Sequence, residues 1–117
     1  MIVDDSTAMR MIVRKTMRQA GFDGHDYSEA EDGAKALAAI KSSKPDLVLS
    51  DWNMPNMTGI ELLENLTKEG ISLKFGFVTT EATPDMRQRA SGAGASFLIS
   101  KPFTPESFKE VLGAHIK

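Results

Sequence analysis

Five polar residues share one feature, which is that each lies at the carboxyl end of a short, largely apolar run of the kind that forms a buried strand. They are Asp4, Asp5, Asp51, Thr79 and Lys101. In a parallel sheet with helices on both faces, ligands bind at the carboxyl ends of the strands. We therefore expect three carboxylates, a hydroxyl group and an ammonium group to converge on one rim of the molecule.

A divalent cation and a phosphoryl group fit such a rim. Carboxylates that lie close together repel each other, so at least one pKa rises unless a cation binds between them. Mg²⁺ prefers oxygen ligands, and it commonly takes one or two carboxylates together with phosphate oxygens. Lys101 can neutralise one phosphoryl oxygen, and Thr79 can donate a hydrogen bond to another. A carboxylate is a competent nucleophile for an acyl phosphate, so an aspartate of this rim can accept the phosphoryl group, with the metal and Lys101 offsetting its charge.

Each of these residues alone has a simpler explanation. An aspartate at the end of a strand is commonly a helix cap or a turn residue, and a threonine there is common too. The pair Lys101-Pro102 could form a plain turn, although an X–Pro bond in a tight loop is a candidate for the cis form, which would aim the lysine side chain. A binding site is favoured because all five residues are expected at the same rim.

The rest of the chain supplies the elements that position this rim. Apolar runs alternate with stretches in which apolar residues recur at helical spacing. Strands are expected at residues 1–3, 25–28, 47–50, 75–78 and 96–100, each followed by a helix. Thr83-Pro84 and Thr104-Pro105 are typical of an N-cap followed by a first helical residue. This alternation predicts an α/β fold, a doubly wound five-stranded parallel sheet in a flavodoxin-like three-layer sandwich.

Composition indicates one ordinary globular domain over residues 1–117, because 41% of the residues are hydrophobic and 26% are charged. The apolar run at the start is short for a strand, which is consistent with a first strand truncated at Met1. Whether the domain stands alone or belongs to a longer regulator is left open. The absence of cysteine excludes disulfides, thiolate catalysis and Cys-ligated zinc.

Charge and hydropathy argue against two classes of partner. The net charge is −2, and the densest basic group, Arg10 to Arg18, has the spacing of a solvated helix face, so binding to nucleic acid is not expected. Apolar runs stay far below the roughly 20 residues that span a bilayer. The start has neither the basic residues nor the long apolar run of a signal peptide. A soluble, cytoplasmic protein without a membrane partner is expected.

Five stretches in order along the chain closely resemble the receiver domain of two-component response regulators, and most closely its single-domain chemotaxis (CheY-like) type. They are IVDDS at 2–6, EAEDG at 29–33, DWNMPNMTG at 51–59, VTTE at 78–81, and GAS at 94–96 leading to KPF at 101–103. Jointly these motifs are highly specific, and they cover essentially the whole chain.

The resemblance implies a role for each site residue. Asp51 resembles the phosphoacceptor, and Asp5 and Asp51 resemble the direct Mg²⁺ ligands, with the backbone carbonyl of Asn53 as a third. Asp4 resembles the acid that acts through metal-bound water.

By the same resemblance, Thr79 is the switch hydroxyl that bonds the phosphoryl group, and Lys101 is the phosphate partner. A histidine kinase or phosphotransfer protein would supply the phosphoryl group, and an output protein or a fused effector domain would receive the signal. Such a domain is not an enzyme on external substrates, since it catalyses only its own phosphorylation and dephosphorylation. Asn53 and Glu81 flank the site and are expected to govern access of the attacking water.

Several positions depart from the family pattern or sit beside the site. Thr80 stands where the family usually has a smaller residue, so it is expected to crowd the phosphoryl pocket. Leu98 replaces an aromatic residue that changes rotamer on activation, and Phe97 cannot substitute because adjacent strand residues point to opposite faces. Trp52 is expected to be a half-exposed rim residue whose fluorescence reports metal binding.

Other functions remain open. The departures at Thr80 and Leu98 are compatible with a phosphorylation-independent binding module that uses the surface formed by the fourth helix, the fifth strand and the fifth helix. A phosphatase with an aspartyl-phosphate intermediate needs a second aspartate two residues after the nucleophile, where this chain has Asn53. A flavin-binding domain is possible on fold alone, but three carboxylates at the rim would repel the phosphate of the flavin.

Overall fold

The computed structural model describes residues 1–22, 26–80 and 82–113, and in this part of the chain five strands alternate with five helices. The strands are β1 (Ile2–Val3), β2 (Glu29–Ala30), β3 (Leu47–Ser50), β4 (Lys74–Thr79) and β5 (Phe97–Ser100). The helices are α1 (Thr7–Gln19), α2 (Gly33–Ser42), α3 (Gly59–Lys68), α4 (Pro84–Ala93) and α5 (Pro105–Leu112). The predicted order of elements is confirmed.

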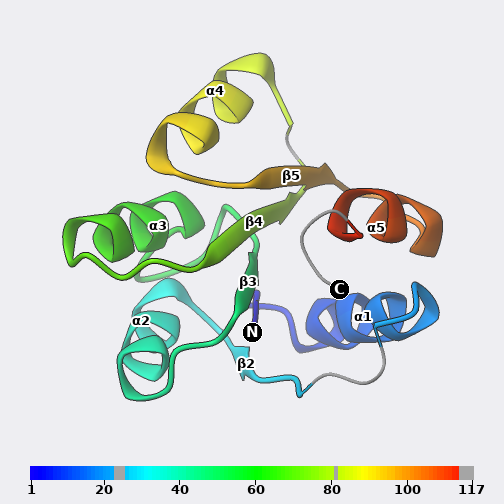
Figure 1. Ribbon diagram of the computed structural model, residues 1–117, viewed down its shortest axis with the longest axis horizontal. Helices are drawn as coiled ribbons and strands as arrows, with labels where there is room; N and C mark the ends of the chain where they lie inside the picture. Colours follow the sequence, from blue (N-terminus) through cyan, green and yellow to red (C-terminus); the bar gives the residue numbers. More distant parts are fainter. Residues whose placement is uncertain (23–25, 81, 114–117) are drawn as a thin grey trace.

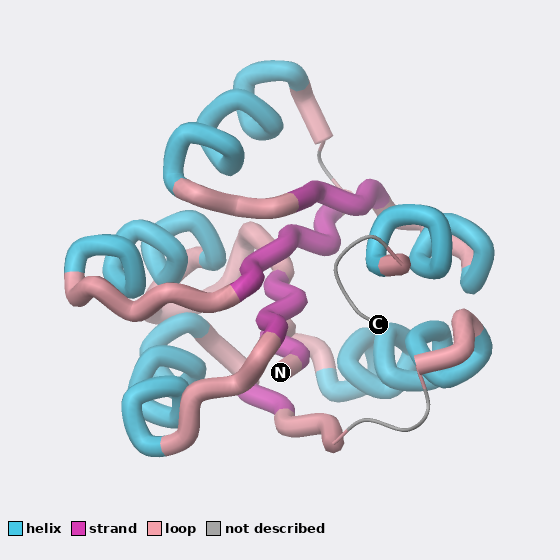
Figure 2. Tube along the Cα trace, in the orientation of Figure 1, coloured by secondary structure: helices cyan, strands magenta, loops and turns pink. Residues whose placement is uncertain are grey.

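All strands run parallel in one sheet of order β2-β1-β3-β4-β5, with helices on both faces (Figure 1). Figure 2 shows α1 and α5 on one side of the sheet and the other helices on the opposite side. The strand order reverses between β1 and β3, which makes their carboxyl ends the switch point where doubly wound sheets bind ligands. The predicted fold class, a doubly wound parallel sheet, is therefore confirmed.

Two buried clusters, one on each face, hold the layers together. Phe75 and Phe77 of β4 belong to the first, which α2 and α3 complete, and Val78 belongs to the second, beneath α1 and α5. This alternation follows from the pleat of the strand, which sends successive side chains to opposite faces. Leu98 packs against the first cluster and Phe97 against the second, so the expectation that these two side chains diverge is confirmed.

The second strand lies a few residues later than predicted. It is formed by Glu29–Ala30, whereas residues 26–28 are not in a strand and His25 lies outside the described residues. The reason is that β1 offers only two residues for pairing, and these align with Glu29 and Ala30. Tyr27, which precedes the strand, packs against the second cluster and donates a hydrogen bond to the carbonyl of Phe22.

Local signals in the sequence predict the starts of α4 and α5 correctly. The hydroxyl of Thr83 accepts a hydrogen bond from the Met86 amide at 3.2 Å, and the hydroxyl of Thr104 accepts one from the Ser107 amide at 3.1 Å. A proline follows each cap in the first turn, where its missing N–H costs nothing. Within the described residues, no helix is both long enough and apolar enough to cross a membrane.

The absence of a side chain at Gly76 allows β4 and β5 to pack closely. Gly76 is paired with Phe97, and a Cβ at position 76 would lie 2.1 Å from the ring atom Cε1 of Phe97. The ring therefore occupies the space above the glycine.

Replacing Gly76 by alanine is expected to lower the free energy of unfolding by about 1–3 kcal/mol, because the ring of Phe97 must move. Gly92→Ala is the matched control, since a Cβ there meets nothing within 4 Å inside α4, and it should raise the stability by about 0.5–1 kcal/mol. Urea unfolding followed by circular dichroism measures both. Equal stabilities of the two variants would contradict this account of the β4–β5 contact.

Candidate metal and phosphoryl site

The three carboxylates expected at the rim lie together. Asp4, Asp5 and Asp51 each place a carboxylate oxygen within 4.8 Å of the others. Parallel pairing of β1 with β3 brings them close, because Val3 is aligned with Ser50 and the Asp51 amide donates a 2.8 Å hydrogen bond to the Val3 carbonyl. The grouping predicted from the strand ends is confirmed.

Lys101 lies beside this cluster and forms ion pairs with two of its carboxylates. Its Nζ is 3.3 Å from Oδ2 of Asp4 and 3.7 Å from Oδ2 of Asp51. The side chains of Lys101, Asp4 and Asp51 are only 10%, 6% and 16% exposed, so solvent screens these ion pairs less than surface pairs. The Lys101-Pro102 bond is cis, as expected for a lysine aimed by its loop.

Backbone amides fix the orientation of two carboxylates. The Ser6 amide donates to Oδ1 of Asp4 at 2.9 Å, and the Trp52 amide donates to Oδ1 of Asp51 at 2.8 Å. In both residues Oδ2 is the oxygen that faces Lys101. The two acids therefore present one oxygen each to the centre of the site while the other is held by the backbone.

The protonation of Asp51 reflects these surroundings. Burial is the largest influence and raises the pKa of the Asp51 carboxyl above its usual value. The charge of Lys101 and the hydrogen bond from Trp52 oppose this rise, whereas the charges of Asp4 and Asp5 add to it. The single ammonium group of Lys101 therefore does not fully offset the cost of holding the Asp51 carboxylate ionised.

The donor set fits a hard divalent cation such as Mg²⁺. Three carboxylates converge on a rim where burial leaves the pKa of Asp51 raised despite Lys101, so a bound cation would stabilise the ionised carboxylates. Asp4, Asp5 and Asp51 are the residues that would hold it, directly or through water. Asn53 lies exposed in the loop after β3, and its expected role as a backbone ligand stays a prediction.

The other predicted site residues lie on the same rim. Thr79 ends β4 and is fully buried, and its carbonyl accepts a 2.8 Å hydrogen bond from the Lys101 amide. Thr80 is exposed, so its branched side chain extends into solvent at this rim. Glu81 lies outside the described residues.

Trp52 is not the half-exposed residue that was predicted. It is only 7% exposed, and its ring lies 4.8 Å from that of Phe77, measured between centroids. The prediction was wrong because it assumed that a neighbour of Asp51 would share its position on the rim. The chain turns after β3 and directs the indole into the first cluster, where burial of a large aromatic ring is favourable.

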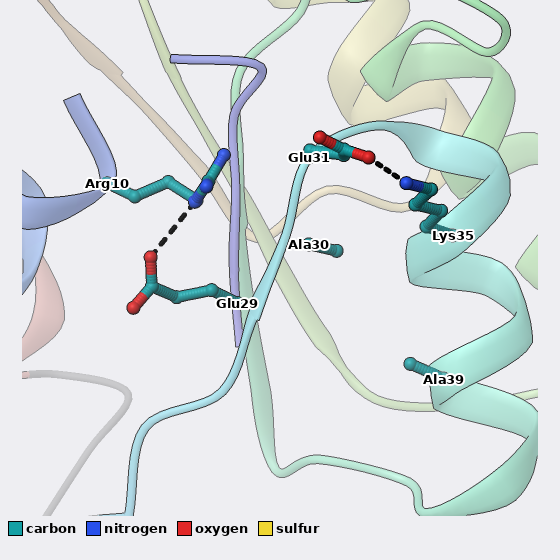
Figure 3. Close-up of a pocket in the computed structure, with 6 residues that line it drawn as sticks. All are labelled: Arg10, Glu29, Ala30, Glu31, Lys35 and Ala39. Atoms are coloured by element: carbon teal, nitrogen blue, oxygen red, sulfur yellow. Dashed lines mark hydrogen bonds and ion pairs between the residues drawn. The ribbon is translucent and has the colours of Figure 1, made fainter. Parts of the chain in front are cut away.

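The expectation of a solvated basic face on α1 is also partly wrong. Arg10 is 13% exposed in its side chain and bridges three elements, since it donates to the Asp4 carbonyl at 2.6 Å and to Glu29 at 2.9 Å. Arg14 pairs with the same glutamate at 3.5 Å. Figure 3 shows Arg10 and Glu29 on one side of the edge strand β2, in a polar pocket whose other side carries the pair Glu31–Lys35. Arg10 thus holds the backbone of Asp4 through a tertiary contact, which the spacing of residues in the sequence does not reveal.

Comparisons with known proteins agree with this geometry. Residues 1–113 match the family model described as the response regulator receiver domain. The chain is 41% identical over 114 residues to the chemotaxis protein CheY-3 of Vibrio cholerae, covering 96% of this chain and 86% of that protein. It is 39% identical over 112 residues to the chemotaxis protein CheY of Pseudomonas aeruginosa, covering 94% and 89%.

A solved structure of the chemotaxis response regulator CheY4 of Vibrio cholerae superposes with a TM-score of 0.84 at 33% identity, covering 97% of this chain and 93% of that one. The chain belongs to the family of response regulator receiver domains. It is therefore a domain of the two-component signalling type, and the resemblance to CheY-like receivers is confirmed.

The raised pKa of Asp51 has a consequence for the metal-free protein. Because the folded state holds the Asp51 proton more tightly than the unfolded state, stability falls as the pH rises from the unfolded to the folded pKa. Asp51→Asn removes this penalty and should raise the unfolding midpoint at pH 7. The gain should shrink as the pH falls below the pKa of Asp51, since wild-type Asp51 is then protonated.

Thermal unfolding in a chelator at several pH values measures this difference. Asp26→Asn, a change at an exposed aspartate outside the cluster, is the control for the loss of one negative charge. An Asp51→Asn midpoint below that of wild type at pH 7 would contradict the account of the site's electrostatics.

Proposed function

We propose that this chain is a phosphorylation-driven switch in which Asp51 accepts a phosphoryl group from a histidine kinase or a phosphotransfer protein. The convergence of three carboxylates and Lys101 on one partly buried rim supports this function. The chain would act in the cytoplasm, and it would catalyse only its own phosphorylation and dephosphorylation.

In the transfer step, a carboxylate oxygen of Asp51 attacks phosphorus, and the bond between phosphorus and the donor nitrogen breaks. Asp51 is suited to this role because its amide-held Oδ1 fixes the direction of the whole carboxylate. Lys101 can form an ion pair with the phosphoryl oxygens during transfer, because its Nζ already lies close to both Asp4 and Asp51. Mg²⁺, when bound by the acidic residues, would neutralise further charge on the transferring group.

Output would pass through Thr79 to the surface formed by α4, β5 and α5. Thr79 is buried at the end of β4, and its backbone is hydrogen-bonded to Lys101 just beyond β5. α4 has one buried residue, Ala90, and is also tied to α3 by a 3.2 Å hydrogen bond from the Thr67 hydroxyl to the Ala93 carbonyl. An element with so little buried area is suited to shift between two positions.

One observation favours a second function, a constitutive binding module. Leu98 is a partly buried aliphatic residue in the first cluster, where an aromatic toggle is expected by family resemblance. Such a module would keep the fold and bind its partner equally well with or without phosphorylation. The two functions differ in whether chemistry at Asp51 changes the α4–β5–α5 surface.

Mg²⁺ with beryllofluoride, which mimics the phosphoryl group, is expected to quench or shift Trp52 fluorescence and to move amide NMR signals at the site and along α4, β5 and α5. Asp51→Asn should abolish both responses, because the mimic needs the carboxylate. Asp26→Asn is the control that should respond like the wild type.

The pattern of NMR shifts separates the two functions. Shifts confined to the surroundings of Asp51 would favour the constitutive module. Identical behaviour of wild type and Asp51→Asn, with no change in either, would refute the phosphorylation-driven switch.

A further inference from the structure

The loop between β3 and α3 carries Asn53 and is tied down at both ends. At the start the Trp52 amide binds Asp51, and the Gly59 amide donates to the Trp52 carbonyl at 2.8 Å. Gly59 also lies so close to Asp51 that a Cβ would be 2.1 Å from the Asp51 carbonyl oxygen. These contacts hold the two ends of the loop. They do not involve its middle, residues 53–57, so other contacts must position that part.

The middle of the loop is fastened to the N-terminus of α2. The Asn56 side-chain amide donates to Oδ2 of Asp32 at 2.9 Å, and the Gly33 amide donates to the Met57 carbonyl at 3.2 Å. A side chain at Gly33 would collide with Met57, since a Cβ there would lie 2.6 Å from the Met57 carbonyl oxygen. The loop and the helix are therefore in close backbone contact as well as side-chain contact.

Asp32 is an unusual carboxylate because it is buried, 4% exposed, and has no cationic partner among the described contacts. Its Oδ1 caps α2 by accepting from the Lys35 amide at 2.8 Å, which leaves Oδ2 for Asn56. The hydrogen bonds from Lys35 and then Asn56 lower the pKa of Asp32. Both oxygens of the ionised group are thus satisfied, and one of the two bonds crosses to the loop.

Asn56 adopts a conformation that its own energetics do not favour. Its φ is +66°, and among the described residues it is the one non-glycine with positive φ. Asparagine tolerates this region better than most residues, but glycine would adopt it more easily. Position 56 therefore carries a side chain at some conformational cost, which is consistent with a structural role for the Asn56 side-chain amide.

We propose that Asp32 and Asn56 are positioning residues, whose hydrogen bond holds the β3–α3 loop in the geometry that binds Mg²⁺ through Asn53 and Asp51. This inference rests on the proposed function, because it concerns the same metal site. The pair acts at a distance, through the backbone of the loop, and touches neither the metal nor the phosphoryl group.

Three proteins of equal net charge test the pair: the wild type, Asn56→Gly and the double variant Asp32→Asn/Asn56→Asp. Asn56→Gly keeps the backbone conformation and removes the amide. The double variant restores the bond with donor and acceptor exchanged. The asparagine introduced at position 32 can still cap α2 with its oxygen while its amide donates to position 56, where aspartate also tolerates positive φ. Equal charge removes the long-range electrostatic effect on cation binding that a single Asp32→Asn change would introduce.

Titration calorimetry with Mg²⁺ alone is the first measurement. Asn56→Gly should raise the Kd by about three- to tenfold, less than the roughly 10–100-fold of partners that touch a metal ligand directly. The double variant should bind within about twofold of wild type. Amide hydrogen exchange in the metal-free protein is the second measurement. Exchange at the Met54 and Met57 amides should speed up in Asn56→Gly and return to the wild-type rate in the double variant.

Ile40→Val is the control for general destabilisation of α2, since Ile40 is buried at the far end of this helix. It should lower the unfolding midpoint and leave the Mg²⁺ Kd unchanged. A wild-type Kd in Asn56→Gly, or equal weakening in Asn56→Gly and the double variant, would overturn the positioning role while the site itself stands. Failure of the wild type to bind Mg²⁺ would instead overturn the proposed function and this inference with it.

Discussion

The close placement of three carboxylates is the constraint around which this rim is organised. Asp4, Asp5 and Asp51 are held within 4.8 Å because β1 and β3 pair in parallel and end at the same level. Burial is the main cause of the raised pKa of Asp51, the charges of Asp4 and Asp5 add to it, and Lys101 offsets only part of the rise. A cation bound by these carboxylates would offset the cost of keeping them ionised and could also bind an anion such as a phosphoryl group.

Much of the surrounding structure serves to hold these charges in place. Backbone amides of Ser6 and Trp52 orient two of the acids, and Arg10 braces the Asp4 carbonyl from α1. The Thr79 carbonyl accepts a hydrogen bond from the Lys101 amide at the ends of β4 and β5. The proposed site and the proposed output surface would therefore be neighbours along two adjacent strands.

The rim was predictable from the sequence because a parallel sheet collects its strand ends on one edge, so local patterns were sufficient to place all five residues. Features that depend on tertiary contacts were not predictable in this way. The second strand was misplaced because its position is set by the two residues that β1 offers for pairing. Trp52 was misjudged because its exposure depends on a turn after β3, and the bond between Asp32 and Asn56 joins residues 24 positions apart on different elements.

Chemical mapping of the phosphorylated residue tests the central claim most directly. Incubation with acetyl phosphate and Mg²⁺, followed by borohydride reduction, converts an aspartyl phosphate to homoserine, which peptide mass spectrometry can locate. We predict homoserine at position 51 alone, and none when a chelator replaces Mg²⁺. Unmodified Asp51 in the presence of Mg²⁺, or modification of another aspartate in its place, would contradict the account.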